Sequence, residues 1–144
     1  YNDLQFQLIE IPSTFDSESL GLLHSCDLIL ILLDATQDLE EQKEQLMNIL
    51  KVSRLDNKKM IFIKTKSKTY KTDKEGIFVD SQSKLGLDEL KEKIWKSLDL
   101  IKVYTKSPGK PRAVPAIAME RNSTVEDFTE RIHKDFTKSF SQNI

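Results

Sequence analysis

Lysine, threonine and serine residues gather directly after a short apolar run in the stretch IFIKTKSKTYK, from Ile61 to Lys71. Hydroxyl groups donate and accept hydrogen bonds, and an ammonium group donates up to three, so this cluster suits an anionic ligand such as a phosphate. The cluster contains no carboxylate. Two interpretations follow: a nucleotide-binding loop that lacks its key residue, or a basic surface.

Charge is distributed unevenly along the 144 residues, although the net charge is −1. Residues 1–50 carry ten acidic residues and one basic residue, whereas residues 51–74 carry nine basic and two acidic residues. Such segregation favours an anionic partner, with a solvated lysine-rich face as the alternative. No apolar run approaches the roughly 18–20 residues of a membrane helix, and no cationic-then-apolar leader opens the sequence, so we expect a cytoplasmic protein without membrane association.

Other residue types that could do chemistry are sparse. The single cysteine, Cys26, fits a reducing compartment. The only histidines are His24 and His133, so the sequence cannot assemble a Cys/His metal cluster at ligand spacing, and we expect no metal site. We expect no catalytic residue among them, because no acidic partner is placed beside His24 and His133 suits a structural role. A carboxylate cluster is expected to cap a helix and complement its dipole: Asp34, Asp38, Glu40, Glu41 and Glu44.

The elements that must position the basic cluster alternate between strands and helices. Strands are predicted from period-two or continuous apolar runs, and helices from apolar residues at helical spacing. The predicted strands are 4–11, 27–34, 60–63 and 76–79, and the predicted helices are 39–52, with Asp38 and Glu41 as its cap, and 87–98. This order predicts an α/β fold with a doubly wound, mostly parallel sheet, in which ligands bind beyond the carboxyl ends of the strands.

A second, smaller domain is predicted after residue 99. Residues 100–105 and 116–119 read as strands around the basic loop KSPGKPRAVP, and a helix follows, with Ser123 as its N-cap and Glu126 completing a capping box. This arrangement indicates the beginning of a β-grasp unit. We therefore divide the chain into domains 1–99 and 100–144.

The second domain resembles the TGS domain of the developmentally regulated GTP-binding (DRG) family, which is related to Obg. The runs VYTK, PGK, STVEDF and IHKDF occur in the order and spacing of that family. LIEIPS, HSCDLILILLDA and LGLDELKEKIWKSLDLIKVYTK are similar to the latter half of the family's P-loop GTPase-like G domain. The resemblance covers nearly the whole chain but not the whole family architecture, and the TGS part lacks the later strands that a β-grasp sheet needs. Truncation, a partner strand or a different packing would each account for this.

The departures from the family pattern fall on phosphate and Mg²⁺ handling. The chain contains no G-x-x-x-x-G-K-[ST] stretch, which surrounds phosphates with backbone N–H groups and an ammonium. At the switch motif D-x-P-G of the family, this chain has Glu10, Pro12 and Ser13. Because of these departures, we expect this chain to have no cofactor. GTP or GDP with Mg²⁺ would be expected only if an upstream segment supplied the phosphate loop.

The family's guanine-reading motif N-K-x-D aligns with Thr65, Lys66, Ser67 and Lys68. Lys66 fits the lysine that stacks on the base, but Lys68 offers only donors where the family's carboxylate accepts two hydrogen bonds from guanine. A register shifted by one would place Ser67 there. The final motif, S-A in the family, falls near Ser81 and is partly kept.

We therefore expect no GTP hydrolysis by this chain and interpret it as a degenerate G domain that acts as a binding module. RNA, the ribosome or a regulatory protein are the expected partners, and the sequence does not fix the oligomeric state. A basic groove with an aromatic suits phosphates and a stacked base. Its predicted residues are Lys102, Tyr104, Lys106, Lys110 and Arg112. Two alternatives remain: Tyr104 packs in an apolar layer beside merely solubilising lysines, or the chain is the C-terminal part of a GTPase whose phosphate loop lies upstream of Tyr1.

Overall fold

The computed structural model describes residues 3–66 and 76–141, with no description of the side chains of residues 134–141. The chain forms two compact units, here called the sheet unit (Gln7–Leu98) and the terminal unit (Tyr1–Phe6 with Asp99–Ile144). The boundary between residues 98 and 99 lies at the end of a helix. Residues 3–6 group with the terminal unit, whereas the prediction from sequence assigned them to domain 1–99.

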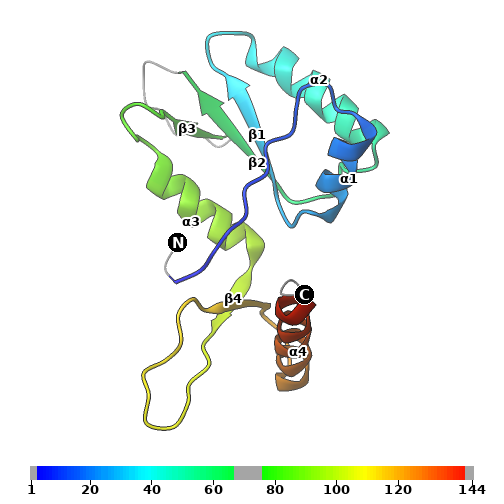
Figure 1. The fold of residues 1–144 in the computed structure, drawn as a ribbon. Coiled ribbons are helices and arrows are strands. Elements are labelled where there is room, and N and C mark those ends of the chain that lie inside the picture. Colours follow the sequence, from blue (N-terminus) through cyan, green and yellow to red (C-terminus); the bar gives the residue numbers. More distant parts are fainter. Residues whose placement is uncertain (1–2, 67–75, 142–144) are drawn as a thin grey trace. The chain divides into compact units, whose positions relative to one another are not determined.

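The sheet unit contains three parallel strands, in the order β1 (Ile29–Asp34), β2 (Met60–Thr65) and β3 (Ile77–Val79) (Figure 1). The helices are α1 (Ser17–Ser25), α2 (Leu39–Val52) and α3 (Leu87–Leu98). The register aligns Asp34 with Thr65 and Thr65 with Val79, so the three strands end at one edge. The prediction of an α/β fold with a parallel sheet is confirmed for these strands.

The helix ends follow from local side chains. Asp38 is the N-cap of α2, where its Oδ1 accepts a hydrogen bond from the backbone N–H of Glu41 at 3.0 Å, as predicted. Asp16 caps α1 in the same way through Ser19 N–H at 2.8 Å. The other end of α1 is bound by Lys58, whose Nζ donates to the carbonyl groups of His24 and Cys26 at 2.6 and 2.7 Å. A cation there complements the negative end of the helix dipole.

The core of the sheet unit lies between β1 and the helices α1 and α2. It consists of Leu23, Ile29, Ile31, Leu33, Leu50 and Leu55. On β2, the side chains of Ile61 and Ile63 point away from this core, because neighbouring residues of a strand face opposite sides of the sheet. Both are nevertheless buried, at 2% and 3% exposure. The strand β1 is not covered on both faces, because Leu32 is 61% exposed.

The prediction of a strand at residues 4–11 is wrong. The structure places these residues in extended chain without ladder hydrogen bonds, and the side chains of Phe6, Leu8 and Ile9 are exposed. A period-two pattern forms a strand only where a neighbouring edge accepts its backbone groups. Among the described strands, β1 pairs with β2 and with no other, and residues 4–11 do not use its second edge.

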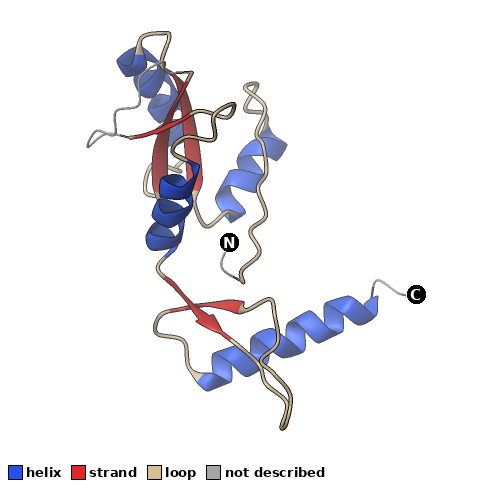
Figure 2. Ribbon diagram, turned by 90° about the vertical axis from the view of Figure 1, so that its left-hand side faces the viewer, coloured by secondary structure: helices blue, strands red, loops and turns tan. Residues whose placement is uncertain are grey.

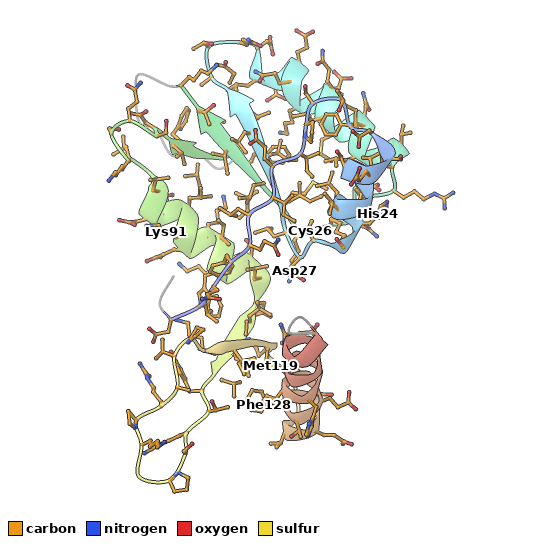
Figure 3. The ribbon with its side chains drawn as sticks, viewed as in Figure 1. His24, Cys26, Asp27, Lys91, Met119 and Phe128 are labelled. Atoms are coloured by element: carbon orange, nitrogen blue, oxygen red, sulfur yellow. The ribbon has the colours of Figure 1, made fainter. Side chains whose placement is uncertain are left out.

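The terminal unit pairs two antiparallel strands, β4 (Leu100–Val103) and β5 (Ile117–Glu120), and continues into α4 (Val125–Ser141) (Figure 2). Figure 3 shows the Phe128 side chain directed from α4 toward the strand that carries the buried Met119. The strand–loop–strand–helix order matches the sequence prediction.

The capping box of α4 is displaced by one residue from the predicted Ser123 and Glu126. Thr124 Oγ1 accepts from Asp127 N–H at 3.2 Å, and Asp127 Oδ2 accepts from Thr124 N–H at 2.7 Å. Hydroxyl and carboxylate thereby satisfy each other's backbone donors, which is the reciprocal geometry of a capping box. The sequence STVED offers two boxes in adjacent registers, and periodicity does not choose between them.

Candidate functional site

The basic cluster begins at the carboxyl edge of the sheet, where β1 and β2 end side by side. Lys66, directly after β2, donates from Nζ to Oδ2 of Asp34 at 2.6 Å. The Lys66 side chain is 68% exposed and the Asp34 side chain 18%. The structure therefore joins two predicted residues that the sequence left unconnected, the lysine of the guanine-motif remnant and an acid assigned to helix capping.

Asp34 is also held by Thr36, which donates to Oδ1 from its backbone N–H at 3.0 Å and from its hydroxyl at 2.7 Å. These bonds favour the ionised carboxylate. The hydrogen bond from Lys66, followed by those from Thr36, lowers the pKa of Asp34 to about 2. Asp34 is consequently a fixed anion beside Lys66 at any physiological pH.

Gln42 on α2 fixes the backbone of Asp34. Its Oε1 accepts from Asp34 N–H at 2.9 Å, and its Nε2 donates to the carbonyl groups of Asp34 and Asp38, each at 2.9 Å. The primary amide thus pairs with the last residue of β1 as a neighbouring strand would. Nothing in the sequence pattern identified Gln42, because its partner lies eight residues away across a loop.

The remaining guanine-motif residues are engaged differently. The Thr65 hydroxyl donates to the carbonyl group of Leu33 at 3.1 Å, a contact within the sheet. Ser67 and Lys68 lie outside the described residues. Ser81 is exposed in a turn that Asp80 stabilises.

Asp80 organises that turn by accepting hydrogen bonds from the backbone N–H groups of Gln82 and Ser83, both at 3.1 Å, and from the Ser83 hydroxyl. The Ser83 hydroxyl bond, with the two backbone bonds, lowers the pKa of Asp80. The turn follows β3, so Ser81 lies at the same carboxyl edge as Lys66. The sequence missed Asp80 as an organising residue, although an Asp before Ser-Gln-Ser is typical of a side-chain-stabilised turn.

The switch-motif remnant lies in the extended chain that precedes α1. Glu10, Pro12 and Ser13 are all exposed, and a turn closes there through a hydrogen bond from Phe15 N–H to the Pro12 carbonyl at 3.2 Å. No described hydrogen bond or ion pair joins Glu10 to the Lys66–Asp34 pair.

The predicted RNA-contact residues lie on β4 and on the loop between β4 and β5. The guanidinium of Arg112 stacks on the ring of Tyr104 with its Cζ 4.3 Å from the ring centroid. Lys106 and Lys110 are exposed, and Lys102 is half-buried on β4. Two backbone bonds shape the loop, from Ala113 N–H to Thr105 O at 2.8 Å and from Lys110 N–H to Ser107 O at 3.1 Å.

An acidic residue that the sequence did not single out, Asp3, completes this group. Tyr104 donates its hydroxyl to Asp3 Oδ2 at 3.0 Å, and Arg112 Nη2 donates to the same oxygen at 3.3 Å. Burial, followed by the hydrogen bond to Asp3 and the charge of Asp3, raises the pKa of Tyr104. Asp3 is about a hundred residues from its partners in the chain, so no local pattern could have revealed it.

Three further candidates remain outside both groups. His24 and His133 are exposed, and the Cys26 thiol donates to the carbonyl group of Leu23 at 3.1 Å (Figure 3). Within the described ranges, no group of three or more His, Cys, Asp or Glu residues is arranged to hold a metal ion.

Comparison with known proteins connects the chain to GTP-binding proteins. It is 36% identical over 96 residues to an uncharacterized GTP-binding protein of Methanocaldococcus jannaschii, covering 66% of this chain and 24% of that protein. It is 43% identical over 68 residues to developmentally-regulated G-protein 3 of Arabidopsis thaliana, covering 43% of this chain and 17% of the relative. GTP-binding protein 1 of Schizosaccharomyces pombe is 38% identical over 61 residues, which are 42% of this chain and 17% of that relative. The chain is a homologue of the DRG family of GTP-binding proteins.

The DRG homologue spans about a quarter or less of the length of these relatives. No family model matches the chain. In the described part of the structure, no helix is both long and apolar enough to cross a membrane. Homology to GTP-binding proteins agrees with the parallel three-stranded sheet.

Proposed function

We propose that this DRG homologue does not hydrolyse GTP as it stands and acts as an RNA-binding module through its terminal unit. The observation that carries the first part is that this sequence contains no G-x-x-x-x-G-K-[ST] stretch, and the ion pair with Asp34 adds that the lysine assigned to the base has a partner within the protein. The sequence contains no phosphate loop, so the groups that phosphoryl transfer depends on are lacking from this chain.

The second part of the proposal rests on the loop between β4 and β5. It presents exposed Lys106 and Lys110 together with Arg112, and Arg112 is already stacked on an aromatic ring. Cations beside an aromatic face combine phosphate neutralisation with a surface on which a base can stack. We further propose that the terminal unit is a partial TGS domain, as its motifs indicate.

Binding to structured RNA tests this function directly. The 144-residue chain is titrated with a labelled RNA hairpin, and anisotropy is followed between low and physiological salt. We expect affinity to fall linearly on a double-logarithmic plot, with a slope of roughly 0.7–0.9 for each phosphate neutralised. Lys106→Gln with Lys110→Gln should weaken binding and flatten the slope.

The control removes the same charge elsewhere: Lys91→Gln with Lys96→Gln on α3, where both lysines are exposed beside acidic neighbours. Equal losses in the two double variants would indicate a general charge effect and not this loop. Absence of salt-dependent RNA binding would refute the RNA-binding function. Capture of a protein at high salt would then favour a regulatory protein partner.

An alternative function is the C-terminal part of a GTP-binding GTPase whose phosphate loop precedes this sequence. Its support is the fraction of the relatives that the chain spans, 24% or less in the matches above. The product of the whole gene, titrated calorimetrically with GDP and Mg²⁺, distinguishes the two. Binding heat there, abolished by changing a G-x-x-x-x-G-K-[ST] lysine upstream, would establish the alternative, and GTP turnover by the 144-residue chain would refute our proposal.

A further inference from the structure

The Tyr104–Arg112 pair has the geometry of an anion-binding site. The stacked guanidinium is fixed in orientation by the ring beneath it, 4.3 Å away. Its Nη2 and the phenol O–H both donate to one oxygen, Oδ2 of Asp3, at 3.3 and 3.0 Å. Two donors that converge on one anionic oxygen recognise a phosphate oxygen by the same chemistry.

We propose that Tyr104 and Arg112 form a phosphate-binding site and that Asp3 occupies it in the free chain. Asp3 therefore acts as an internal competitor that an incoming phosphate must displace. This inference rests on the proposed RNA-binding function for the source of the phosphate, a backbone group of the RNA. It adds a regulatory contact that the resemblance to the DRG family does not supply.

The chain holds Asp3 in place through its neighbours. Ala116 N–H donates to the carbonyl group of Asp3 at 2.7 Å, and Leu4 and Ala116 are 6% and 7% exposed. Asp3 itself has a φ of 70° in the left-handed region, which aspartate and asparagine tolerate better than other non-glycine residues. Asp3→Asn therefore removes the charge while it preserves the backbone and the buried anchor.

Solvent reaches the contact, so a ligand can compete for it. The side chains of Arg112 and Asp3 are 59% and 37% exposed. Ion pairs with this exposure are weak, because water screens them and both side chains lose freedom. The raised pKa of Tyr104 keeps the proton on the phenol, so its O–H stays available as a donor near neutral pH.

The chain offers a matched control in Asp99. It belongs to the same unit, has a φ of 52°, and accepts from Arg121 Nε at 2.9 Å. Asp99→Asn thus removes the same charge from an exposed ion pair with an arginine and from a similar backbone conformation, although the Asp99 side chain is more exposed than that of Asp3, at 59% against 37%. Any general electrostatic gain in RNA affinity appears in both variants, and only displacement from the Tyr104–Arg112 site distinguishes them.

The experiment measures RNA-hairpin affinity and, separately, the affinity for inorganic pyrophosphate by NMR shifts of the Ala116 amide and the Arg112 Nε–H signal. We expect Asp3→Asn to bind both ligands about three- to fivefold more tightly than Asp99→Asn does, a ratio of the size that weak surface pairs allow. Adding Arg112→Gln to Asp3→Asn should abolish the gain.

The two readouts separate the inference from the proposed function. If RNA binds but Asp3→Asn and Asp99→Asn behave alike with both ligands, Asp3 is no competitor and the inference is wrong. If no variant binds RNA while pyrophosphate still prefers Asp3→Asn, the site stands and the RNA-binding function fails. If no variant binds either ligand, both are refuted.

Discussion

Gln42 offers the sharpest test of how the carboxyl edge of the sheet is held together. Replacing it by alanine removes three hydrogen bonds of 2.9 Å, two to the backbone of Asp34 and one to the carbonyl group of Asp38. The Asp34 bonds are partly buried and the Asp38 bond is exposed. The variant also leaves the last N–H group of β1 without its amide partner.

The expected loss follows from these bonds. Each net hydrogen bond contributes about 0.5–1.5 kcal/mol, and the exposed one belongs at the lower end of that range. Alanine regains about 0.4 kcal/mol of helix propensity relative to glutamine. Gln42→Ala should therefore lower the free energy of unfolding of the sheet unit by about 2 kcal/mol.

Urea unfolding followed by the fluorescence of Trp95, the single tryptophan, reports on the sheet unit because α3 carries it. Gln45→Ala, one turn along α2, is the control, since its described contact is one exposed 3.2 Å bond to Glu41. The gain in helix propensity and the loss of that bond nearly cancel, so Gln45→Ala should change the free energy of unfolding by less than about 0.5 kcal/mol. Equal effects of the two variants would refute the role assigned to Gln42.

Three further predictions concern the same unit. Asp34→Asn should weaken the dependence of stability on acid pH, because the stabilisation from the Asp34–Lys66 pair is fully present above about pH 4 and is lost as the pH falls through about 2. The difference in unfolding free energy between wild type and variant, measured by urea unfolding, should therefore shrink across that window. A difference that stays constant would refute the prediction. Lys58→Met should cost about 1 kcal/mol through two lost bonds to the end of α1, whereas Lys59→Met, which loses one exposed 3.3 Å bond, should cost less; equal midpoints would contradict this. Gly76→Ala should destabilise by about 1–2 kcal/mol, because its Cβ would lie 3.1 Å from a backbone oxygen of β2, and an unchanged midpoint would show that the strand relaxes freely.

The sequence predicted the elements whose signals are local and strong. The helix at 39–52 has an apolar face and an N-cap at Asp38, and the structure reproduces both its bounds and its cap. The apolar runs of β1, β2 and β3 predicted strands of a parallel sheet for the same reason. In each case the residues that decide the structure lie within a few positions of one another.

The errors arose where a partner decides the outcome. Residues 4–11 have the alternation of a strand, yet the structure gives them no ladder partner. The capping box of α4 moved by one residue to Thr124 and Asp127, because two adjacent registers offered compatible side chains. Local pattern specifies what a segment can do, and packing selects among the possibilities.

By itself, then, the sequence determined the alternation of strands and helices, the homology to GTP-binding proteins and the basic residues that follow β2 and β4. Only the tertiary structure decided what those basic residues contact. It joined Lys66 to Asp34 across 32 positions and Arg112 to Asp3 across 109. The physical reason is that ion pairs and stacked contacts depend on distances of a few ångströms, which sequence spacing does not encode once the chain has folded back on itself.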